Sequence, residues 1–250
     1  MEPRQNDHEA AYWDQWNALN RETGRGEVSV DQGRVVRTWL GLLGRRDLRI
    51  LEVGCGAGWF VDQLVTYGEV TGVDISSTVL ERARLRTPQA TFITGDVMDI
   101  DLAPSSFDVV IGLEVLSHVA DHEAFVRRLA EVLVDDGHLF LATQNRPVLQ
   151  DHCTIPPAHP DARRKWFSAD ELVDLVTDHF SVQTLRSVTP TAHHGYRHYP
   201  ASPRIRRALE RTLGTSAARA WSWPMERAGW GFTLMLHARK TPTSPIKEQH

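Results

Sequence analysis

The stretch from Ile50 to Phe60, read I-L-E-V-G-C-G-A-G-W-F, decides the fold of this chain. Its glycines, Gly54, Gly56 and Gly58, occupy every second position directly after a short apolar run. Glycine lets a backbone turn sharply and lets a ligand approach it closely, and such loops between a strand and a helix lie at the carboxyl edge of a parallel sheet. The stretch therefore predicts a strand, a turn that faces a ligand, and a helix.

Strands and helices alternate on either side of this loop, which is typical of a parallel sheet. The runs V-V-I-G-L (109–113) and L-F-L-A (139–142) are continuously apolar, as central strands covered on both faces should be. Ser168 and Glu171 form a capping box that marks the start of a late helix. We expect strands at 49–53, 70–73, 91–94, 108–113, 138–143, 180–186 and 231–238, and helices at 7–22, 29–43, 57–66, 76–86, 122–133, 168–177 and 203–213.

These elements predict one α/β domain, with a seven-stranded, mostly parallel sheet and helices on both faces. Residues 1–45 are expected to form a helical lid and lead-in, and 46–145 the ligand-binding core. Residues 146–240 would add a C-terminal helical insertion and complete the sheet, while the polar tail 241–250 is expected to be disordered.

The composition excludes several classes of protein. A net charge of −4 gives no general attraction to nucleic acid or anionic membranes, although charge can gather locally. No stretch approaches the roughly 18 apolar residues of a membrane span, and residues 1–11 lack a signal-peptide core, so we expect a cytoplasmic protein. Cys55 and Cys153 are the only cysteines, which excludes a disulfide framework and a cysteine-rich metal site.

The position of the third glycine helps to choose between two cofactor classes. The dinucleotide fingerprint G-x-G-x-x-G needs its third glycine one residue later than Gly58, where bulky Trp59 stands instead. A dinucleotide is therefore disfavoured. Asp74 lies 20 residues after Gly54 at the end of the second strand, where a carboxylate can accept hydrogen bonds from both hydroxyls of a ribose.

A third site aligns on the same edge of the sheet. Asp96, in the run T-G-D-V after the third strand, is placed to accept a hydrogen bond from the exocyclic amine of adenine. Val97 and Ile75 would form apolar walls around the base. A glycine-rich turn with no ligand is the plain structural alternative, but the two carboxylates disfavour it.

Taken in this order, the motifs resemble the class I S-adenosylmethionine-dependent methyltransferases, which have a Rossmann-like fold. The match runs over roughly 28–239 and consists of E-V-G-C-G-A-G, V-T-G-V-D, T-G-D-V and F-D-V-V-I-G-L-E-V-L-S-H-V. The resemblance implies S-adenosyl-L-methionine as cofactor and S-adenosyl-L-homocysteine as product. The residues that it implies at the cofactor are Glu52, Gly54, Cys55, Gly56, Gly58, Asp74, Ile75, Asp96, Val97 and Leu113.

Within that family the chain is most similar to the ubiquinone-pathway O-methyltransferases, through L-E-V-L-S-H-V, A-T-Q-N-R-P and R-K-W-F-S-A-D-E-L. Their cofactor-binding arginine falls on Arg34, 20 residues before Gly54. That family usually carries a glutamate where this chain has Ser117, which puts in doubt any metal or quinone-type substrate tied to the glutamate. We predict no metal site.

His118, just past the fourth strand, is the first candidate for a catalytic base, because a neutral imidazole accepts a proton from a hydroxyl near pH 7. A histidine that only packs at this turn is the competing interpretation. Glu114 could orient His118 or contact the cofactor, or serve as a structural carboxylate. Trp13, with Tyr12 and Trp16, could form an aromatic lid over the cofactor, or simply pack a helix.

Two further segments are ambiguous. The run H-H-G-Y-R-H-Y (193–199) contains metal-ligand residue types but no nearby carboxylates, so a polar loop is favoured over a metal site. The arginines of the helix at 203–213 are typical of a solvated face, and the sharper readings are a phosphate-bearing substrate, a lipid headgroup or RNA. The absence of a D/N-P-P-Y/F motif counts against a nucleic-acid substrate.

The sequence thus predicts transfer of a methyl group from S-adenosylmethionine to an oxygen, or less favourably a nitrogen or carbon, of a small molecule. An RNA methyltransferase and a non-catalytic adenosyl-ligand-binding protein are the alternatives. The identity of the acceptor and the oligomeric state are left open by the sequence.

Overall fold

The computed structural model describes residues 26–155 and 163–242. One seven-stranded sheet forms the centre of the molecule, in the order β3-β2-β1-β4-β5-β7-β6. All neighbouring strands are parallel except β7, which runs antiparallel to both β5 and β6. The strands are β1 (Leu48–Val53), β2 (Gly68–Asp74), β3 (Thr91–Thr94), β4 (Phe107–Leu113), β5 (Leu133–Gln144), β6 (Phe180–Pro190) and β7 (Gly231–Lys240).

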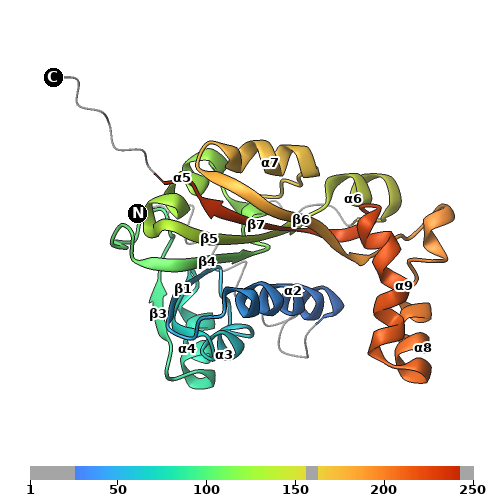
Figure 1. The fold of residues 1–250 in the computed structure, drawn as a ribbon, viewed down its shortest axis with the longest axis horizontal. Helices are drawn as coiled ribbons and strands as arrows, with labels where there is room; N and C mark the ends of the chain where they lie inside the picture. The colour runs from blue at the N-terminus through green and yellow to red at the C-terminus, as the bar shows by residue number, and fades with distance from the viewer. Residues whose placement is uncertain (1–25, 156–162, 243–250) are drawn as a thin grey trace, which may run out of the picture.

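Helices cover both faces of the sheet, and each face has its own apolar core (Figure 1). On one face the core joins the sheet to α2 (Glu27–Leu43), α3 (Val61–Leu64) and α4 (Ser77–Arg86). On the other it joins the sheet to α5 (His122–Val132) and α7 (Ala169–Thr177). The predicted Rossmann-like architecture is confirmed.

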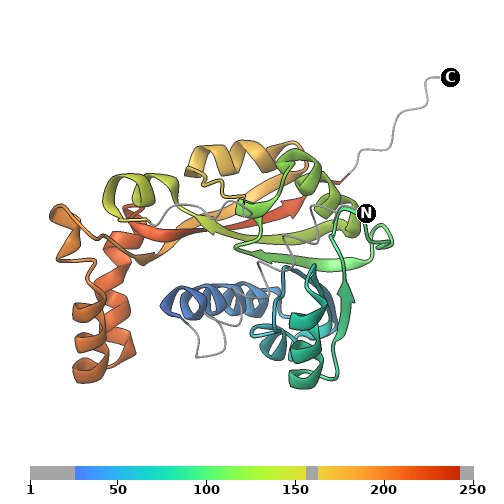
Figure 2. The same ribbon diagram turned by 180° about the vertical axis from the view of Figure 1, so that it is seen from behind.

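The remaining helices belong to the C-terminal insertion. They are α6 (Arg146–His152), α8 (Pro203–Leu213) and α9 (Thr215–Arg227), with the short 3-10 turn η2 (Tyr196–His198). A second 3-10 turn, η1 (Leu116–His118), follows β4. The α8–α9 hairpin stands at one end of the sheet and projects away from it in both views (Figures 1 and 2). No helix in the described ranges is long and apolar enough to cross a membrane.

The sheet changes direction of growth between β1 and β4, which lie side by side although β2 and β3 separate them in the sequence. In open α/β sheets, ligands bind outside the carboxyl ends of the strands at such a switch point. The glycine loop follows β1 directly, so the topology places it at this position.

Most predicted elements are confirmed within a few residues, including the end of α2 at Gly44, whose left-handed backbone (φ 67°) closes the helix. The predicted capping box at the start of α7 is present. The predicted helix at 57–66 is mostly wrong: only Val61–Leu64 is helical, because the chain is still turning through the glycine loop before it. The predicted helix at 7–22 lies outside the described residues.

Two helices were not predicted. α6 begins directly after Asn145 with a proline in its first turn, a position where proline costs no hydrogen bond. α9 contains Pro224 near its C-terminal end, a residue that usually ends a helix. β5 begins at Leu133, five residues before the strand expected at 138–143, and contains an irregularity with Asp136 at φ 62°.

Candidate cofactor site

The three loop glycines all have left-handed backbone, with φ of 70° at Gly54, 54° at Gly56 and 67° at Gly58. A Cβ atom at the first would lie 3.2 Å from the Cβ of Val115, and one at the third 3.1 Å from the Cβ of Ala83 in α4. Glycine is therefore required here by the backbone itself and by packing on two sides. The approach of a ligand is not the only reason for the triplet.

The loop is held by β2. The backbone N–H groups of Gly54 and Cys55 both donate to the carbonyl of Val73, at 2.8 and 3.1 Å. The side chain of Cys55 is fully buried in the core, and burial raises the pKa of its thiol. Cys55 can therefore reach a ligand only through its backbone.

Asp74 ends β2 and connects it to the glycine loop. Its carboxylate accepts from the N–H of Gly56 at 2.8 Å and from the N–H of Ser76 at 3.0 Å. Each carboxylate oxygen has a second lone pair, so this geometry is compatible with the predicted ribose contact. Asp74 therefore also holds the glycine loop in place, through its hydrogen bond from Gly56.

Asp96 lies in the turn after β3, where its Oδ1 accepts from the N–H of Met98 at 3.0 Å. Val97 is only 4% exposed and packs in the apolar core below the turn, whereas Ile75 and Leu113 are half-buried. Ile75 and Leu113 therefore offer more surface for a ligand than Val97 does.

Glu52 is the clearest sign that a cation belongs at this edge. The residue is 2% exposed, and its Oε2 has no hydrogen-bond partner among the described residues. Burial, followed by the nearby charges of Asp62 and Asp74, raises the pKa of Glu52 to about 8. A buried carboxylate that lacks a donor is costly, and an ammonium group would supply both a donor and a compensating charge. The methionine portion of S-adenosylmethionine carries such a group.

Glu114 follows β4 in a left-handed conformation, with φ of 65°. Its Oε1 accepts from the amide of Gln32 at 2.5 Å and from the hydroxyl of Thr233 at 3.1 Å. Sequence reasoning missed both donors, because Gln32 and Thr233 lie 82 and 119 residues away and show no local motif. These contacts tie the carboxylate to α2 and β7.

His118 lies in η1, where its Nδ1 is 2.6 Å from the backbone carbonyl oxygen of Arg163. A carbonyl only accepts, so Nδ1 carries the proton and Nε2 of the neutral ring holds the lone pair. Burial lowers the pKa of His118 below its usual value of 6.5. The ring is therefore neutral at pH 7, as a proton acceptor must be.

Ser117 is fully buried beside His118. Its hydroxyl lies 3.0 Å from that of Thr143 and also bonds to the side chain of Gln144. The position that is usually glutamate in the ubiquinone-pathway enzymes is thus part of a neutral network against β5. No cluster of three or more metal-binding side chains occurs in the described part of the chain.

Two of the predicted cofactor residues, Arg34 and Trp13, are not placed by the structure as cofactor contacts. The guanidinium of Arg34 lies 3.6 Å from Asp31 and 3.9 Å from Glu226, so it takes part in a charge cluster between α2 and α9. Any contact with a cofactor would have to be made alongside these ion pairs. Trp13 and its proposed lid fall outside the described residues.

The ambiguous segments are also resolved in part. His193 accepts from the N–H of Thr154 at 2.9 Å, and the Nδ1 of His198 lies 3.1 Å from the carbonyl oxygen of Ala192, as in a polar loop. In α8, Arg206 binds both oxygens of Asp31, and Arg207 pairs with Glu27. Two of the arginines considered for RNA are therefore engaged in ion pairs with α2, although Arg207 stays exposed to solvent.

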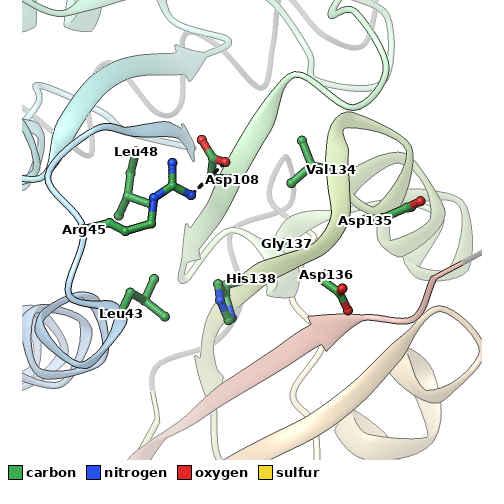
Figure 3. A pocket seen from close by; sticks show the side chains of 9 residues that line it. All are labelled: Leu43, Arg45, Leu48, Asp108, Val134, Asp135, Asp136, Gly137 and His138. Atoms are coloured by element: carbon green, nitrogen blue, oxygen red, sulfur yellow. Dashed lines mark hydrogen bonds and ion pairs between the residues drawn. The ribbon is translucent and has the colours of Figure 1, made fainter.

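A cavity of about 320 Å³ lies elsewhere on the molecule (Figure 3). It is formed where β1, β4 and β5 begin, so it is at the amino edge of the sheet, opposite the glycine loop. Arg45 and Asp108 form an ion pair across one wall. The cavity is lined by Leu43, Arg45, Leu48, Asp108, Val134, Asp135, Asp136, Gly137 and His138.

Comparison with known proteins agrees with this geometry. Residues 51–141 match a family described as a methyltransferase domain. The ubiquinone biosynthesis O-methyltransferase of Mesorhizobium japonicum is 36% identical over 104 residues, which are 40% of this chain and 42% of that protein. A probable S-adenosylmethionine-dependent methyltransferase of Mycobacterium tuberculosis is 32% identical over 130 residues, which are 52% of this chain and 47% of that protein. The chain thus spans about half the length of these curated relatives.

Among solved structures, the magnesium protoporphyrin IX methyltransferase of Synechocystis with bound S-adenosylmethionine superposes with a TM-score of 0.60. The alignment covers 96% of this chain and 99% of that one at 19% identity. At this identity the likeness establishes the fold alone.

Proposed function

We propose that this chain, which carries a class I S-adenosylmethionine-dependent methyltransferase domain, transfers the methyl group to an oxygen of a small-molecule acceptor. The observation that carries the choice of oxygen is the state of His118. Its Nδ1–H is fixed by the Arg163 carbonyl and its pKa is lowered by burial, so a neutral ring with a basic Nε2 stands at the end of β4. Such a group suits removal of a hydroxyl proton.

S-adenosylmethionine, when bound, supplies an electrophilic methyl group on a sulfonium. In this proposal Asp74 holds the ribose, Asp96 the adenine amine, and Glu52 the methionine ammonium. The unsatisfied Oε2 of Glu52 fits that last role, because a buried carboxylate gains a donor and an opposite charge in one contact.

The chain's own contribution to the reaction is orientation and proton removal. The acceptor hydroxyl would lie in line with the methyl group, and His118 Nε2 would take its proton as the oxygen attacks. S-adenosylmethionine would donate its methyl group to that oxygen as the bond from methyl to sulfur breaks, and the sulfur would keep the electron pair in S-adenosylhomocysteine. Proximity and exclusion of water supply much of the acceleration in such transfers.

A small-molecule acceptor is favoured over RNA by the ion pairs of α8, because Arg206 and Arg207 are engaged with α2. The names of the ubiquinone-pathway relatives support a hydroxylated aromatic acceptor, at modest identity. Ser117 separates this chain from their usual pattern, so a different hydroxylated compound is equally compatible. That the protein works in the cytoplasm stays a prediction.

The test is a pH–rate profile of methyl transfer to a panel of hydroxylated aromatic compounds, measured with radiolabelled cofactor. We expect kcat/KM to fall in acid with an apparent pKa below the usual 6.5 of histidine. Protonation of His118 removes the base, and burial lowers the pKa at which this protonation occurs. His118→Ala should lose about 100-fold or more in rate and lose this acid limb, with cofactor affinity unchanged.

His179→Ala is the matched control, because His179 lies between α7 and β6, away from η1. It should leave both the rate and the profile unchanged. An His118→Ala variant that keeps the wild-type rate would exclude this base. Transfer to amines but never to hydroxyls would contradict the choice of oxygen.

A further inference from the structure

The segment 196–227 differs in charge from the rest of the chain. It contains seven arginines and two glutamates, a net charge of +5 within a chain whose total is −4, so the remaining residues together carry −9. Part of this charge is used internally, since Arg206 and Arg207 pair with α2 and Glu226 pairs with Arg186. Arg204, Arg211 and Arg219 are exposed and form no ion pair with another described residue.

The same segment holds most of the large apolar side chains that face solvent among the described residues. Every exposed tryptophan or tyrosine in the described part of the chain lies within it: Tyr196 (69%), Tyr199 (75%), Trp221 (43%) and Trp223 (55%). Exposed aliphatic side chains accompany them, Leu213 at 68% and Ile205 at 36%. Large apolar side chains gathered on a surface mark an interaction site.

These side chains extend over the length of the α8–α9 hairpin. Leu213 lies at the turn between the helices, while Trp221 lies at the base, where its Nε1 donates to the carbonyl of Pro200 at 2.9 Å. The Arg227 guanidinium lies 5.0 Å from the Trp223 ring centre, so cation and aromatic surface are presented together. α8 has no buried residue, and the hairpin projects from the end of the sheet (Figures 1 and 2).

We propose that the α8–α9 hairpin, with its entry loop 196–202, docks this protein on a membrane surface that contains anionic lipids. Tryptophan and tyrosine favour the boundary between headgroups and acyl chains, and exposed arginines bind lipid phosphates. Leu213 and Ile205 favour lipid over RNA, because single-stranded RNA is bound chiefly through aromatic stacking and charge, whereas aliphatic side chains insert among acyl chains. In this proposal the hairpin lies on the membrane surface and does not span the membrane.

The hairpin is also connected to the cofactor edge. Arg206 of α8 binds Asp31, and the next residue, Gln32, donates to Glu114 at the end of β4. A docked hairpin would therefore hold this edge close to the lipid surface. The docking proposal does not depend on methyl transfer and is tested without it.

The experiment is co-sedimentation of the full chain with sucrose-loaded vesicles, either of phosphatidylcholine alone or of equal parts phosphatidylcholine and phosphatidylglycerol. We expect binding to the anionic vesicles only, weakened by salt because the attraction is between exposed charges. The double variant Leu213→Ser/Arg211→Gln should bind about tenfold more weakly, through loss of one apolar side chain and one cation.

The matched control is Leu85→Ser/Arg127→Gln, which changes one exposed leucine and one exposed arginine on α4 and α5. It should bind like the wild type, and far-ultraviolet circular dichroism should show both variants folded. Equal losses in the two variants, or no vesicle binding, would overturn the proposal. Binding of a single-stranded RNA probe without vesicle binding would overturn it in favour of nucleic acid.

Discussion

Glycine is required in the glycine loop for two reasons, of which the sequence indicates only one. The pattern predicts close approach of a ligand, and the structure adds a left-handed backbone and contacts with Val115 and Ala83. Local motifs could predict Asp74 and Glu52, because each follows from its position on a strand. They could not predict that Gln32 and Thr233 hold Glu114, because that contact exists only after α2 and β7 have packed.

Replacement of Gly58 by alanine should destabilise the fold. The new Cβ would require a left-handed conformation, which costs about 1 kcal/mol, and would press on Ala83 at 3.1 Å, for a total of about 1–3 kcal/mol. The free energy of unfolding in urea measures this. Gly41→Ala in α2 is the control, because nothing lies within 4 Å of its added Cβ and helix propensity favours alanine. Equal stability of the two variants would contradict the packing argument.

At the scale of elements, the attachment of the α8–α9 hairpin to α2 is the feature that prediction from sequence missed. Hydrophobic periodicity located the strands and most helices because burial on the sheet imposes it. It missed α9, which contains the W-S-W-P run, and it left the arginines of α8 open between a solvated face and a site for a phosphate-bearing substrate, a lipid headgroup or RNA. The pairing of Arg206 with the buried Asp31, 175 residues away, has no local signal.

Arg206→Met should therefore cost stability, by about 1–3 kcal/mol. Asp31 is 5% exposed, and loss of Arg206 leaves its buried negative charge without the bidentate partner that offsets the cost of burial. The loss of stability is smaller than for a fully buried pair, because Arg206 is partly exposed. Thermal and urea unfolding measure the change. Arg204→Met, two residues earlier in α8 at an exposed position, should stay within about 0.5 kcal/mol of the wild type. Equal effects would show that the ion pair contributes nothing.

For the whole molecule, the order of strands brings together residues that are far apart in the chain. The expected carboxyl-edge site depends on β1 and β4 being neighbours, and the observed strand order provides this. The predicted fold is confirmed, and residues 51–141 match a methyltransferase domain, which agrees with the predicted family and cofactor class. The acceptor could not be predicted, because acceptor sites are built from variable loops.

The central claim is that the glycine loop, Asp74 and Asp96 bind an adenosyl cofactor. Calorimetric titration of the full chain with S-adenosylhomocysteine, beside NADH, tests it most directly. We predict micromolar binding of S-adenosylhomocysteine alone, weakened at least tenfold in Asp74→Asn, where one charged acceptor is lost while the side chain keeps its shape. Asp99→Asn, on an exposed carboxylate of the neighbouring turn, should bind like the wild type. Binding of NADH in its place, or of neither ligand to a folded protein, would contradict the account.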